Sequence, residues 1–474
     1  MDQVNRTAGI RRCKILLISA NRCTTPEPVF PLGLAYLSAA LRQSGHQVIW
    51  LDPLCADHLE EVLEESTPDL VGISLRNIDD VLIRRQETFV GNLGELVSTI
   101  RRKRACPVVL GGSGFSILPR ELLELSGADY GIVGQGEAAF PALIQALQTG
   151  EDFRAIPGLI ARQQGDFIRN ASDTASPALQ LEAGDWPQEI SAYYLQAGGM
   201  LNVQTQRGCA HRCCYCTYPL IEGTRHRRRS PQAVVSEFEQ LEKLGANYTF
   251  VVDSVFNSSA AHVTEICEAL QRRKIKIRWG CFLRPQNLTP EMMRLMAGAG
   301  LAHIEFGSDS FCDKVLVEYQ KGLTFEDIRR STELARDEGI DFCHFVIAGG
   351  PGETPETLEI SFKNSLTLGS PIIMAVPGMR IYPGTDLFNR AVAEGQVRAE
   401  ANLSQPTYYL APGLHLAQVL ELLRSFAGQA PNWIVGDSDP AYEKLVNRLR
   451  QRGVSGPLWS YLATAQRLWP KGAR

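Results

Sequence analysis

The sequence lacks the features that mark several special classes of protein. No apolar run approaches the roughly 20 residues needed to cross a bilayer, and residues 1–12 lack the apolar middle of a secretory signal. It also lacks an excess of either charge, because 48 Lys and Arg stand against 52 Asp and Glu. A dedicated nucleic-acid-binding protein is usually basic. We therefore expect a cytoplasmic chain with no membrane span and no nucleic-acid partner.

The rest of the composition is that of an ordinary globular protein. The 474 residues are 44% hydrophobic and 21% charged, which is not the composition of a disordered chain. At roughly 100–200 residues per domain, the length predicts two to four domains, each large enough to bury a core.

Cysteine is abundant but unevenly spread. Twelve cysteines are present, and four of them fall within eight residues, at Cys209, Cys213, Cys214 and Cys216. The other eight are scattered singly, mostly among apolar residues. Cysteines spaced along a short secreted chain suggest disulfides, whereas one tight cluster in a long chain suggests a metal site.

Residues 1–150 alternate between predicted strands and helices. The predicted strands are 14–18, 47–51, 69–74, 107–110 and 130–133, and the predicted helices are 32–45, 59–65, 94–103 and 137–148. This alternation predicts right-handed crossovers and a doubly wound parallel sheet, the α/β architecture of a Rossmann-like domain. Ligands of such sheets bind at the carboxyl ends of the strands.

A second alternating series occupies residues 197–392. Its predicted strands are 201–205, 248–252, 277–282, 303–306, 342–347 and 372–379, with helices at 231–244, 261–272, 290–299, 324–338 and 357–368. Six βα units are fewer than the eight of a closed barrel, so we expect a partial (β/α)6 barrel. Residues 151–196 predict a hairpin over 158–169 and a linker. Residues 393–474 predict a helical carboxy-terminal region without strands, with helices at 416–427, 441–452 and 457–468.

The cysteine cluster directly follows the first predicted barrel strand. Cys209, Cys213 and Cys216 have the spacing C-x3-C-x2-C on one loop. Three thiolates suit one face of an iron–sulfur cube, whereas a fully ligated cluster takes four cysteines. One iron is then left open to a small-molecule chelator, and an open coordination position is typical of a catalytic metal site.

Three other interpretations of the cysteine cluster compete with this one. A structural zinc site could take Cys214 or His211 as its fourth ligand, but zinc ligands normally come from two separated pairs. A redox pair of Cys213 and Cys216 would have to open the helix of a thioredoxin-like unit, which the flanking sequence does not support. The thiols could also simply be packed in a core. The position at a strand-to-loop junction favours the iron–sulfur interpretation.

The cluster resembles the signature of the radical S-adenosylmethionine (SAM) superfamily, C-x3-C-x-aromatic-C, with Tyr215 as the aromatic residue. Other segments between about residues 202 and 390 look like those of its cobalamin-dependent branch. They are RRRSP at 227–231, FVVDSVF at 250–256, WGCFLR at 279–284, IEFGSDS at 304–310, GPGET at 350–354 and YPGT at 382–385. The resemblance implies that Cys209, Cys213 and Cys216 ligate a 4Fe–4S cluster whose fourth iron is chelated by SAM. It implies SAM contacts at Tyr215, Asp253, Arg284, Ser308 and Lys321.

The charged residues among these also have plainer interpretations. An ammonium group favours Asp253, and a carboxylate favours Arg284 or Lys321, but either cation could instead be a solvated charge. Glu305 is equally well an ordinary buried ion-pair partner. The dense positive run at 225–229 could hold an acidic or phosphorylated substrate, or tRNA. Its place just before a helix N-cap favours a structural or SAM-facing role.

The amino-terminal domain carries a glycine motif in its last βα turn. Gly134, Gly136 and Ala139 match the dinucleotide fingerprint G-x-G-x-x-A, but that fingerprint belongs to the first turn of a Rossmann unit, so NAD is not expected. The domain instead resembles the cobalamin-binding domain of this radical SAM branch. The segments are PLGLAY at 31–36, GHQV at 45–48, DLVGI at 69–73, VLGG at 109–112 and DYGIVGQGE at 129–137. Implied cobalamin contacts are Asn21, Ser74, Arg76, Gly112, Ser113, Gly134, Gln135, Gly136 and Glu137.

One departure concerns the lower face of the cobalamin. Many cobalamin domains supply an axial histidine from the motif D-x-H-x-x-G, and none of the eight histidines lies in such a motif. We therefore expect cobalamin to be bound without a histidine ligand on its lower face. His46, which follows a predicted helix, is expected to be structural.

The resemblance implies an enzyme with three cofactors, a 4Fe–4S cluster, SAM and cobalamin. The expected reaction is C-methylation of an unactivated carbon of a biosynthetic intermediate. The alternative is a cobalamin-dependent radical cyclisation, ring contraction or other carbon-skeleton rearrangement. Expected partners are a small-molecule, lipid or natural-product substrate and an external electron donor such as flavodoxin or ferredoxin. No catalytic side chain is identified at this level.

Overall fold

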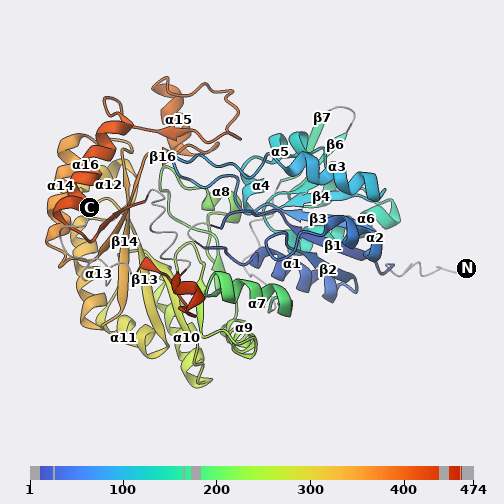
Figure 1. The fold of residues 1–474 in the computed structure, drawn as a ribbon, viewed down its shortest axis with the longest axis horizontal. Helices are drawn as coiled ribbons and strands as arrows, with labels where there is room; N and C mark the ends of the chain where they lie inside the picture. Colours follow the sequence, from blue (N-terminus) through green and yellow to red (C-terminus); the bar gives the residue numbers. More distant parts are fainter. Residues whose placement is uncertain are drawn as a thin grey trace, which may run out of the picture.

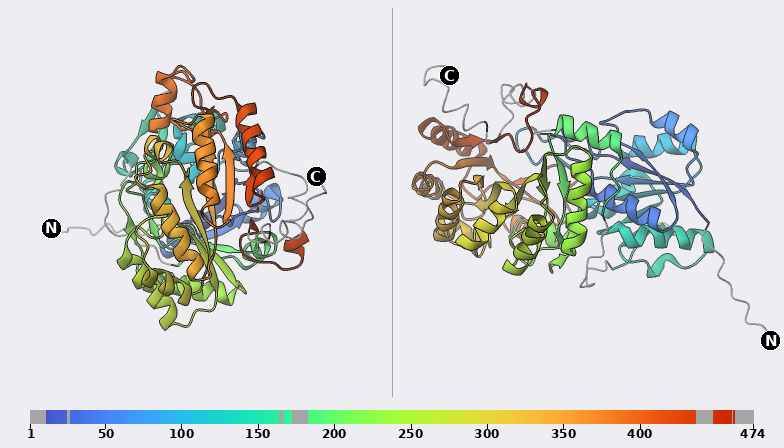
Figure 2. Two further views of the ribbon diagram at one scale, coloured as in Figure 1. Left: turned by 90° about the vertical axis from the view of Figure 1, so that its left-hand side faces the viewer. Right: turned by 90° about the horizontal axis from the view of Figure 1, so that it is seen from below.

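The chain forms two α/β lobes that lie side by side (Figure 1; Figure 2, right). This computed structural model describes residues 11–24, 27–163, 166–171, 183–436, 448–459 and 461. The blue-to-cyan lobe is the amino-terminal domain, and the green-to-red lobe is the predicted barrel. No helix within these residues combines the length and apolar character that crossing a membrane requires.

The amino-terminal lobe is built on the predicted doubly wound sheet. Its strands are β1 (Lys14–Ser19), β2 (Gln47–Leu51), β3 (Leu70–Ser74), β4 (Val108–Gly111), β5 (Tyr130–Ile132), β6 (Leu159–Gln163) and β7 (Asp166–Arg169). They are arranged in the order β2-β1-β3-β4-β5-β6-β7. The first five strands are parallel, and the β6–β7 hairpin continues the sheet in antiparallel sense. The predicted hairpin is therefore an extension of this sheet.

Helices cover both faces of this sheet. They are α1 (Leu32–Gln43), α2 (Leu59–Ser66), α3 (Leu93–Lys103), α4 (Ser113–Ile117), α5 (Pro119–Ser126) and α6 (Gly136–Thr149). Apolar side chains of α1 and α6 form one core layer, and those of α2, α3 and α5 form the other. Sequence reasoning missed α4 and α5, because both are short and follow β4 without a polar loop between them.

The second lobe is a parallel sheet curved into an open barrel. Its strands are β8 (Leu201–Val203), β11 (Tyr248–Val251), β12 (Arg278–Leu283), β13 (Leu301–Asp309), β14 (Asp341–Ala348), β15 (Ile372–Pro377) and β18 (Trp433–Val435). Their order is β18-β15-β14-β13-β12-β11-β8, so that β8 and β18 are the two edges. The six predicted strands are all present. The outer helices are α9 (Pro231–Lys243), α10 (Ala260–Arg272), α11 (Pro290–Gly298), α13 (Phe325–Asp337), α14 (Pro355–Leu366) and α16 (Leu416–Gln429).

Two expectations about the connecting and terminal segments were wrong. The carboxy-terminal region is not purely helical, because β18 adds a seventh parallel strand beside β15 and β17 (Tyr408–Tyr409) pairs with β16 (Met379–Arg380). These strands are two or three residues long, too short to show a periodicity. The linker contains a helix, α7 (Gln188–Ala197). Most of each predicted helix, at 441–452 and at 457–468, lies outside the described residues.

The carboxy-terminal segment 448–459 packs against the barrel near its open side. The guanidinium group of Arg450 forms an ion pair with Glu27, and both side chains are largely buried. Trp459 donates its indole N–H to Glu305 at 3.0 Å, and its ring packs edge-on against His303. The carboxy-terminal segment therefore holds Glu305. Its carboxyl group was expected to be the partner in a buried ion pair, but it accepts a hydrogen bond from the neutral indole of Trp459 instead.

The buried carboxyl group of Glu305 predicts a specific pH dependence of stability. Burial raises its pKa from 4.5 to about 7, so the folded state favours the protonated form. Stability from this group is complete below about pH 4.5 and is lost as the pH rises to about 7. Glu305→Gln, which keeps an acceptor for Trp459, is expected to gain up to roughly 3 kcal/mol over the wild type across that interval. Urea unfolding at several pH values measures the difference; parallel pH profiles for the two proteins, or an equal change in the exposed control Glu265→Gln, would contradict it.

Two buried ion pairs join the lobes. Arg207 of the barrel donates to Glu137 of the amino-terminal lobe at 2.7 Å, and Arg380 donates to Asp79 at 2.8 Å. The side chains of Asp79 and Arg380 are 0% and 2% exposed. A buried charge without its partner strongly destabilises a protein. These pairs therefore favour the arrangement of the two lobes in which each charge meets its counter-charge.

A third network explains much of the positive run at 225–229. Arg229 is buried and forms an ion pair with Glu237 of α9, and it donates to the hydroxyl group of Tyr36 on α1 at 2.9 Å. Arg227 is also buried and donates to the carbonyl oxygen of Glu222 at 2.7 Å. These two arginines are structural, as the position of the run before the Ser230 N-cap had favoured.

Candidate active site between the two lobes

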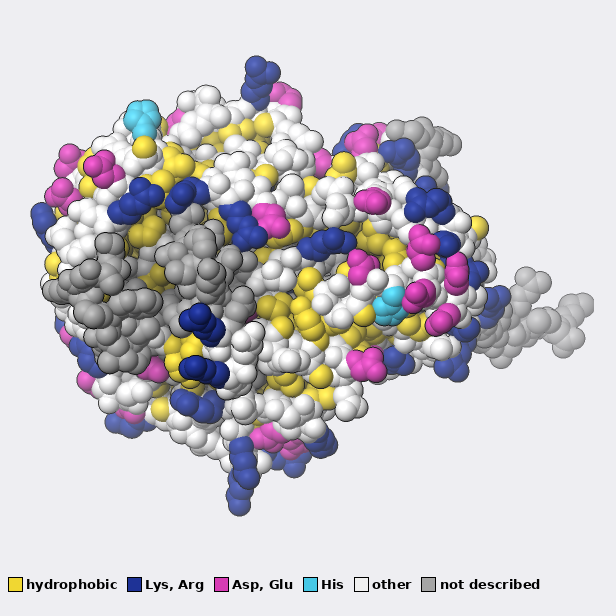
Figure 3. Space-filling model, in the orientation of Figure 1, with side chains coloured by type: hydrophobic (Ala, Val, Ile, Leu, Met, Phe, Trp, Pro, Cys, Tyr) yellow, Lys and Arg dark blue, Asp and Glu magenta, His cyan; other side chains and the backbone are white. Residues whose placement is uncertain are grey.

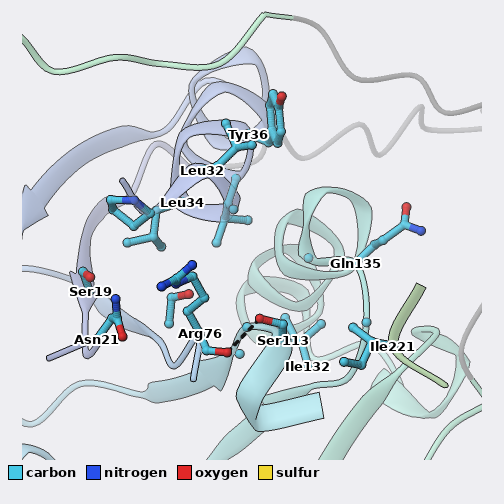
Figure 4. Close-up of a pocket in the computed structure, with 18 of the residues that line it drawn as sticks. Ser19, Asn21, Leu32, Leu34, Tyr36, Arg76, Ser113, Ile132, Gln135 and Ile221 are labelled. Atoms are coloured by element: carbon cyan, nitrogen blue, oxygen red, sulfur yellow. Dashed lines mark hydrogen bonds between the residues drawn. The ribbon is translucent and has the colours of Figure 1, made fainter. Parts of the chain in front are cut away.

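A cavity of about 430 Å³ lies between the lobes, at the carboxyl ends of the parallel strands of the amino-terminal sheet. All nine residues predicted to contact cobalamin line it: Asn21, Ser74, Arg76, Gly112, Ser113, Gly134, Gln135, Gly136 and Glu137. Figure 4 shows Asn21 and Arg76 on one side of the cavity, Ser113 and Gln135 on another, and α1 over it. The barrel completes the wall, with Gln204, Arg207, Tyr218 and Glu222 among the lining residues.

The turn after β4 brings backbone into close contact beneath this cavity. Gly112 has a φ of +100°, and a Cβ atom at this position would overlap the carbonyl oxygen of Leu75. Ser113 follows and donates to the carbonyl oxygen of Arg76 at 2.9 Å (Figure 4). Only glycine lets the β4 turn and the segment after β3 approach in this way.

Gly112→Ala is expected to deform this wall of the cavity and to destabilise the lobe by more than about 1 kcal/mol, because the new methyl group meets backbone that cannot move aside. Cobalamin retained after gel filtration, measured by absorbance, should fall at least about tenfold. Gly91→Ala is the control, because a Cβ atom there meets nothing within 4 Å. Normal retention by the Gly112 variant would contradict the assignment of this wall.

The cavity contains buried polar atoms that have no partner within the protein. They include Nδ2 of Asn21, Nε of Arg76 and the second carboxylate oxygen of Glu137. Burial lowers the pKa of Arg76, although arginine stays charged. No histidine is among the described residues that line the cavity. Orphaned donors and acceptors of this kind fit a large ligand that carries many amide groups.

The three motif cysteines lie on the loop between β9 (Gln206–Arg207) and α8 (Tyr218–Glu222). Cys209 is buried, and Cys213 and Cys216 are half-buried. The amide of Cys209 donates to the carbonyl oxygen of Gly223 at 3.0 Å, and that of Cys216 donates to Cys213 at 3.1 Å. Burial, together with the neighbouring thiols of Cys213 and Cys209, raises the pKa of Cys216 to about 12. The loop thus places the three cysteines directly before α8, whose residues Tyr218, Ile221 and Glu222 line the cavity.

The fourth cysteine of the cluster faces elsewhere. Cys214 is 5% exposed and belongs to the large apolar core, with Leu316 and Tyr319. Its amide donates to the carbonyl oxygen of Tyr319 at 3.0 Å, and its carbonyl oxygen accepts from Leu387 at 2.8 Å. Its side chain therefore fills a core position.

Two predicted SAM contacts lie close to this loop. Arg284 follows β12, and Lys321 follows α12 (Asp313–Glu318); both are largely buried. Burial alone would lower the pKa of Lys321, but the carboxylate of Asp309 at 2.7 Å and the Cys213 thiol raise it above its usual value. Two cations beside the three thiols can attract the carboxylate group of a small ligand.

Asp309 is a site residue that sequence reasoning missed. It accepts a hydrogen bond from the hydroxyl group of Tyr215 and pairs with Lys321 at 2.7 Å. It also has a φ of +64° at the end of β13, which is uncommon for an aspartate. The available signal was its place at the end of the IEFGSDS segment, where a strand carboxyl end meets the site.

The structure places two other predicted SAM contacts differently. The hydroxyl group of Ser308 is 2.7 Å from Nδ1 of His344, whose Nε2 lies 3.1 Å from Thr332 on α13. Ser308 thus points toward the outer helices, away from the cysteine loop, because successive strand residues alternate between faces. The predicted SAM contact of this side chain is not supported.

Asp253 is close to the loop but already engaged. It accepts from the backbone amides of Thr205 at 2.7 Å and Gln206 at 3.2 Å, and from the Thr205 hydroxyl group. Burial raises its pKa to about 7. In this arrangement Asp253 holds the segment that leads into the cysteine motif, and the expected contact with an ammonium group would have to share its oxygens.

The comparisons with known proteins agree with this architecture. Residues 19–144 match the B12 binding domain family and residues 203–363 the radical SAM superfamily. The chain is similar to the radical SAM methyltransferase TsrM of Kitasatospora setae, solved with cobalamin and a 4Fe–4S cluster (TM-score 0.86, 27% identity, covering 97% of this chain and 98% of that one). It is 28% identical over 442 residues to the tryptophan 2-C-methyltransferase of Streptomyces laurentii, covering 79% of this chain and 74% of that protein. OxsB, at 16% identity and TM-score 0.74, shares the fold.

The fold and the site define an enzyme in which a cobalamin-binding lobe faces a cysteine-bearing partial barrel. The chain belongs to the cobalamin-dependent radical SAM enzymes, and its cofactors are a 4Fe–4S cluster, SAM and cobalamin.

Proposed function

We propose that this enzyme transfers the methyl group of SAM, by way of cobalamin, to a carbon atom of a small biosynthetic intermediate. The observation that carries the proposal is the shared wall between the cavity and the cysteine loop. Thr217 and Tyr218, which directly follow Cys216, and Ile221 of α8 line the same cavity as the nine predicted cobalamin contacts. A ligand of the amino-terminal lobe and a ligand of the cysteine loop would therefore meet in one chamber.

In this proposal the chain binds and orients its cofactors. Cys209, Cys213 and Cys216 hold the cluster, and Arg284 and Lys321 attract the carboxylate group of SAM. When bound, cobalamin supplies a cobalt centre that can accept and pass on a methyl group. The two lobes bury the chamber between them, which excludes water from reactive groups.

The side chains in the cavity support cobalamin bound without a histidine on its lower face. The cations in the described lining are Arg76, which is half-buried, and Arg207, which is buried, and a guanidinium group has no lone pair to offer a metal. His46, which closes α1, accepts from the amide of Cys13 at 3.3 Å through Nδ1, as expected for a structural histidine. We propose that the cobalt has no protein nitrogen ligand, which electron paramagnetic resonance of the loaded cobalt(II) form would test through the absence of nitrogen splitting.

Product analysis tests the proposed reaction. The enzyme is reconstituted anaerobically with iron, sulfide and hydroxocobalamin, and is then incubated with SAM and a chemical reductant. Methyl transfer predicts S-adenosylhomocysteine that depends on added cobalamin. Formation of 5′-deoxyadenosine without S-adenosylhomocysteine would favour the alternative carbon-skeleton chemistry. Neither product from a fully loaded protein would overturn both.

A further inference from the structure

Arg284 is a buried cation without a carboxylate partner among the described residues. On the face shown in Figure 3, Lys and Arg side chains project into solvent over both lobes, whereas Arg284 is only 8% exposed. Other buried cations each pair with a carboxylate group; examples are Arg207, Arg229, Lys321, Arg380 and Arg450. Within the described parts of the chain, Arg284 forms no ion pair. A buried charge of this kind is costly unless a ligand neutralises it.

The guanidinium group of Arg284 lies close to the cysteine loop and to Lys321. Burial raises the pKa of the Cys209 thiol, and the nearby charge of Arg284 opposes this rise. Nη2 of Arg284 lies 3.5 Å from the position that a Cβ atom on Gly322 would take, and Gly322 directly follows Lys321. The unpaired charge is therefore placed to meet an anionic group of a ligand that binds at the cysteine loop.

The backbone at Arg284 forms a tight turn that Asn257 holds from the end of the neighbouring strand. The amide of Gln286 donates to the carbonyl oxygen of Arg284 at 2.7 Å, which closes a three-residue γ-turn around Pro285. The proline ring fixes φ in the range that such a turn needs. Asn257, which follows β11, donates to the carbonyl oxygen of Arg284 at 2.9 Å and accepts from its amide at 2.9 Å.

The turn brings the side chain of Gln286 back onto the guanidinium group. Nε of Arg284 donates to Oε1 of Gln286 at 3.0 Å, and Nε2 of Gln286 donates to the carbonyl oxygen of Gly322 at 3.1 Å. Gln286 thus links Arg284 to the turn that carries Lys321. A guanidinium group has five N–H donors. Among the residues that the structure describes, only Gln286 accepts from the side chain of Arg284, so both terminal amino groups stay available.

A guanidinium group that is fixed but still charged suits a carboxylate ligand. Its two terminal amino groups can donate in parallel to the two oxygens of a carboxylate. Holding the group at Nε restricts its rotamers before the ligand arrives, which lowers the entropic cost of binding. Because the amide of Gln286 is neutral, it orients the guanidinium group without cancelling the charge, whereas a carboxylate at the same place would cancel it.

We propose that Gln286 is a positioning residue for SAM. It holds the guanidinium group of Arg284 at Nε, so that both terminal amino groups face the carboxylate group of SAM. Gln286 acts through Arg284, and Asn257 supports it by fixing the turn. The inference rests on the proposed function, in which Arg284 attracts that carboxylate group, and it adds the residue that orients the guanidinium.

A comparison of SAM with decarboxylated SAM isolates the carboxylate group, because the analogue keeps the adenosyl, sulfonium and amino groups. Equilibrium dialysis of the reconstituted, oxidised enzyme without reductant gives both dissociation constants in the absence of turnover. In Gln286→Met we expect the dissociation constant for SAM to rise about tenfold and that for decarboxylated SAM to stay within about twofold of the wild type. Gln286→Glu, whose carboxylate neutralises Arg284, should weaken SAM binding further.

The matched control is Gln271→Met on α10. Gln271 is an exposed glutamine whose side-chain amide donates to the carbonyl oxygen of Leu295 at 3.3 Å, so it also bridges two elements, but on the outer helices. This variant should bind both ligands as the wild type does. If Gln286→Met assembles no cluster, Gln286→Ala takes its place, because it puts no apolar chain beside the guanidinium group.

Two variants assign the effect to Arg284. Arg284→Met should weaken SAM binding at least as much as Gln286→Met, and the double variant should bind SAM no more weakly than Arg284→Met, because the glutamine acts through the guanidinium group. If Arg284→Met leaves the SAM affinity unchanged, the proposed role of Arg284 itself fails. If Arg284→Met weakens binding and Gln286→Met does not, only the positioning role fails.

Three further results would overturn the positioning role. They are an equal loss of affinity for SAM and decarboxylated SAM in Gln286→Met, which would show a merely structural effect, losses that add in the double variant, and an equal loss in the Gln271→Met control.

Discussion

Replacing Cys213 by alanine is expected to reduce the iron content of the reconstituted protein from about four per chain to nearly zero. Cys213 is half-buried on the loop that precedes α8, and its thiol is one of the three proposed cluster ligands. A cube held at three corners loses its attachment when one is removed, and exchange with solvent then destroys it. Iron and sulfide analysis after anaerobic reconstitution measures the effect.

Cys214→Ala is the matched control, since it changes the neighbouring residue to the same side chain. Cys214 fills a core position beside Leu316 and Tyr319, so its removal should cost stability on the order of 1 kcal/mol and leave the iron content unchanged. Retained iron in the Cys213 variant, or lost iron in the Cys214 variant, would show that the cluster is held by other ligands.

Replacing Arg380 by methionine is expected to destabilise the protein by about 3–5 kcal/mol, because it leaves the buried carboxylate of Asp79 without a counter-charge. Arg380 also donates to the carbonyl oxygens of Leu403 and Ile381 at 2.8 and 2.6 Å. Asp79 lies on the segment that follows β3 and carries Arg76 into the cavity. We therefore expect weaker cobalamin retention together with a lower urea midpoint.

The double variant Asp79→Asn, Arg380→Met separates the charge from the packing. With the carboxylate removed as well, most of the lost stability should return, whereas the carbonyl groups left without a donor keep a smaller penalty. Urea unfolding of the two single variants and the double variant provides the measurement. Independent, additive losses would show that the pair is not coupled.

Much of the fold could be predicted because each long element had a clear period. Five parallel strands of the first lobe and six of the barrel alternate with amphipathic helices, and tertiary structure only had to bring them together. The elements that could not be predicted are short or depend on contacts with distant parts of the chain. Strand β18 has three residues and exists because it pairs with β15, and α7 lies where turn-forming residues had suggested a linker.

The site was predictable where it depends on backbone and less so where it depends on rotamers. The predicted cobalamin contacts fall at strand ends, which topology alone brings together, and all nine line one cavity. An error of one residue in the position of a strand turns each of its side chains to the opposite face of the sheet. The side chain of Ser308, an expected SAM contact, faces His344 and the outer helices, whereas its neighbour Asp309, which faces the site, was missed.

Transfer of an isotope from SAM to the bound cobalamin tests the account most directly. The reconstituted enzyme is incubated anaerobically with SAM carrying a 13C-labelled methyl group, without substrate, and the cobalamin fraction is examined by nuclear magnetic resonance. The account predicts label attached to cobalt in the wild type and none in Gly112→Ala, which is expected not to hold the cofactor. Cobalamin that is bound stoichiometrically but stays unlabelled, while SAM is consumed, would contradict it.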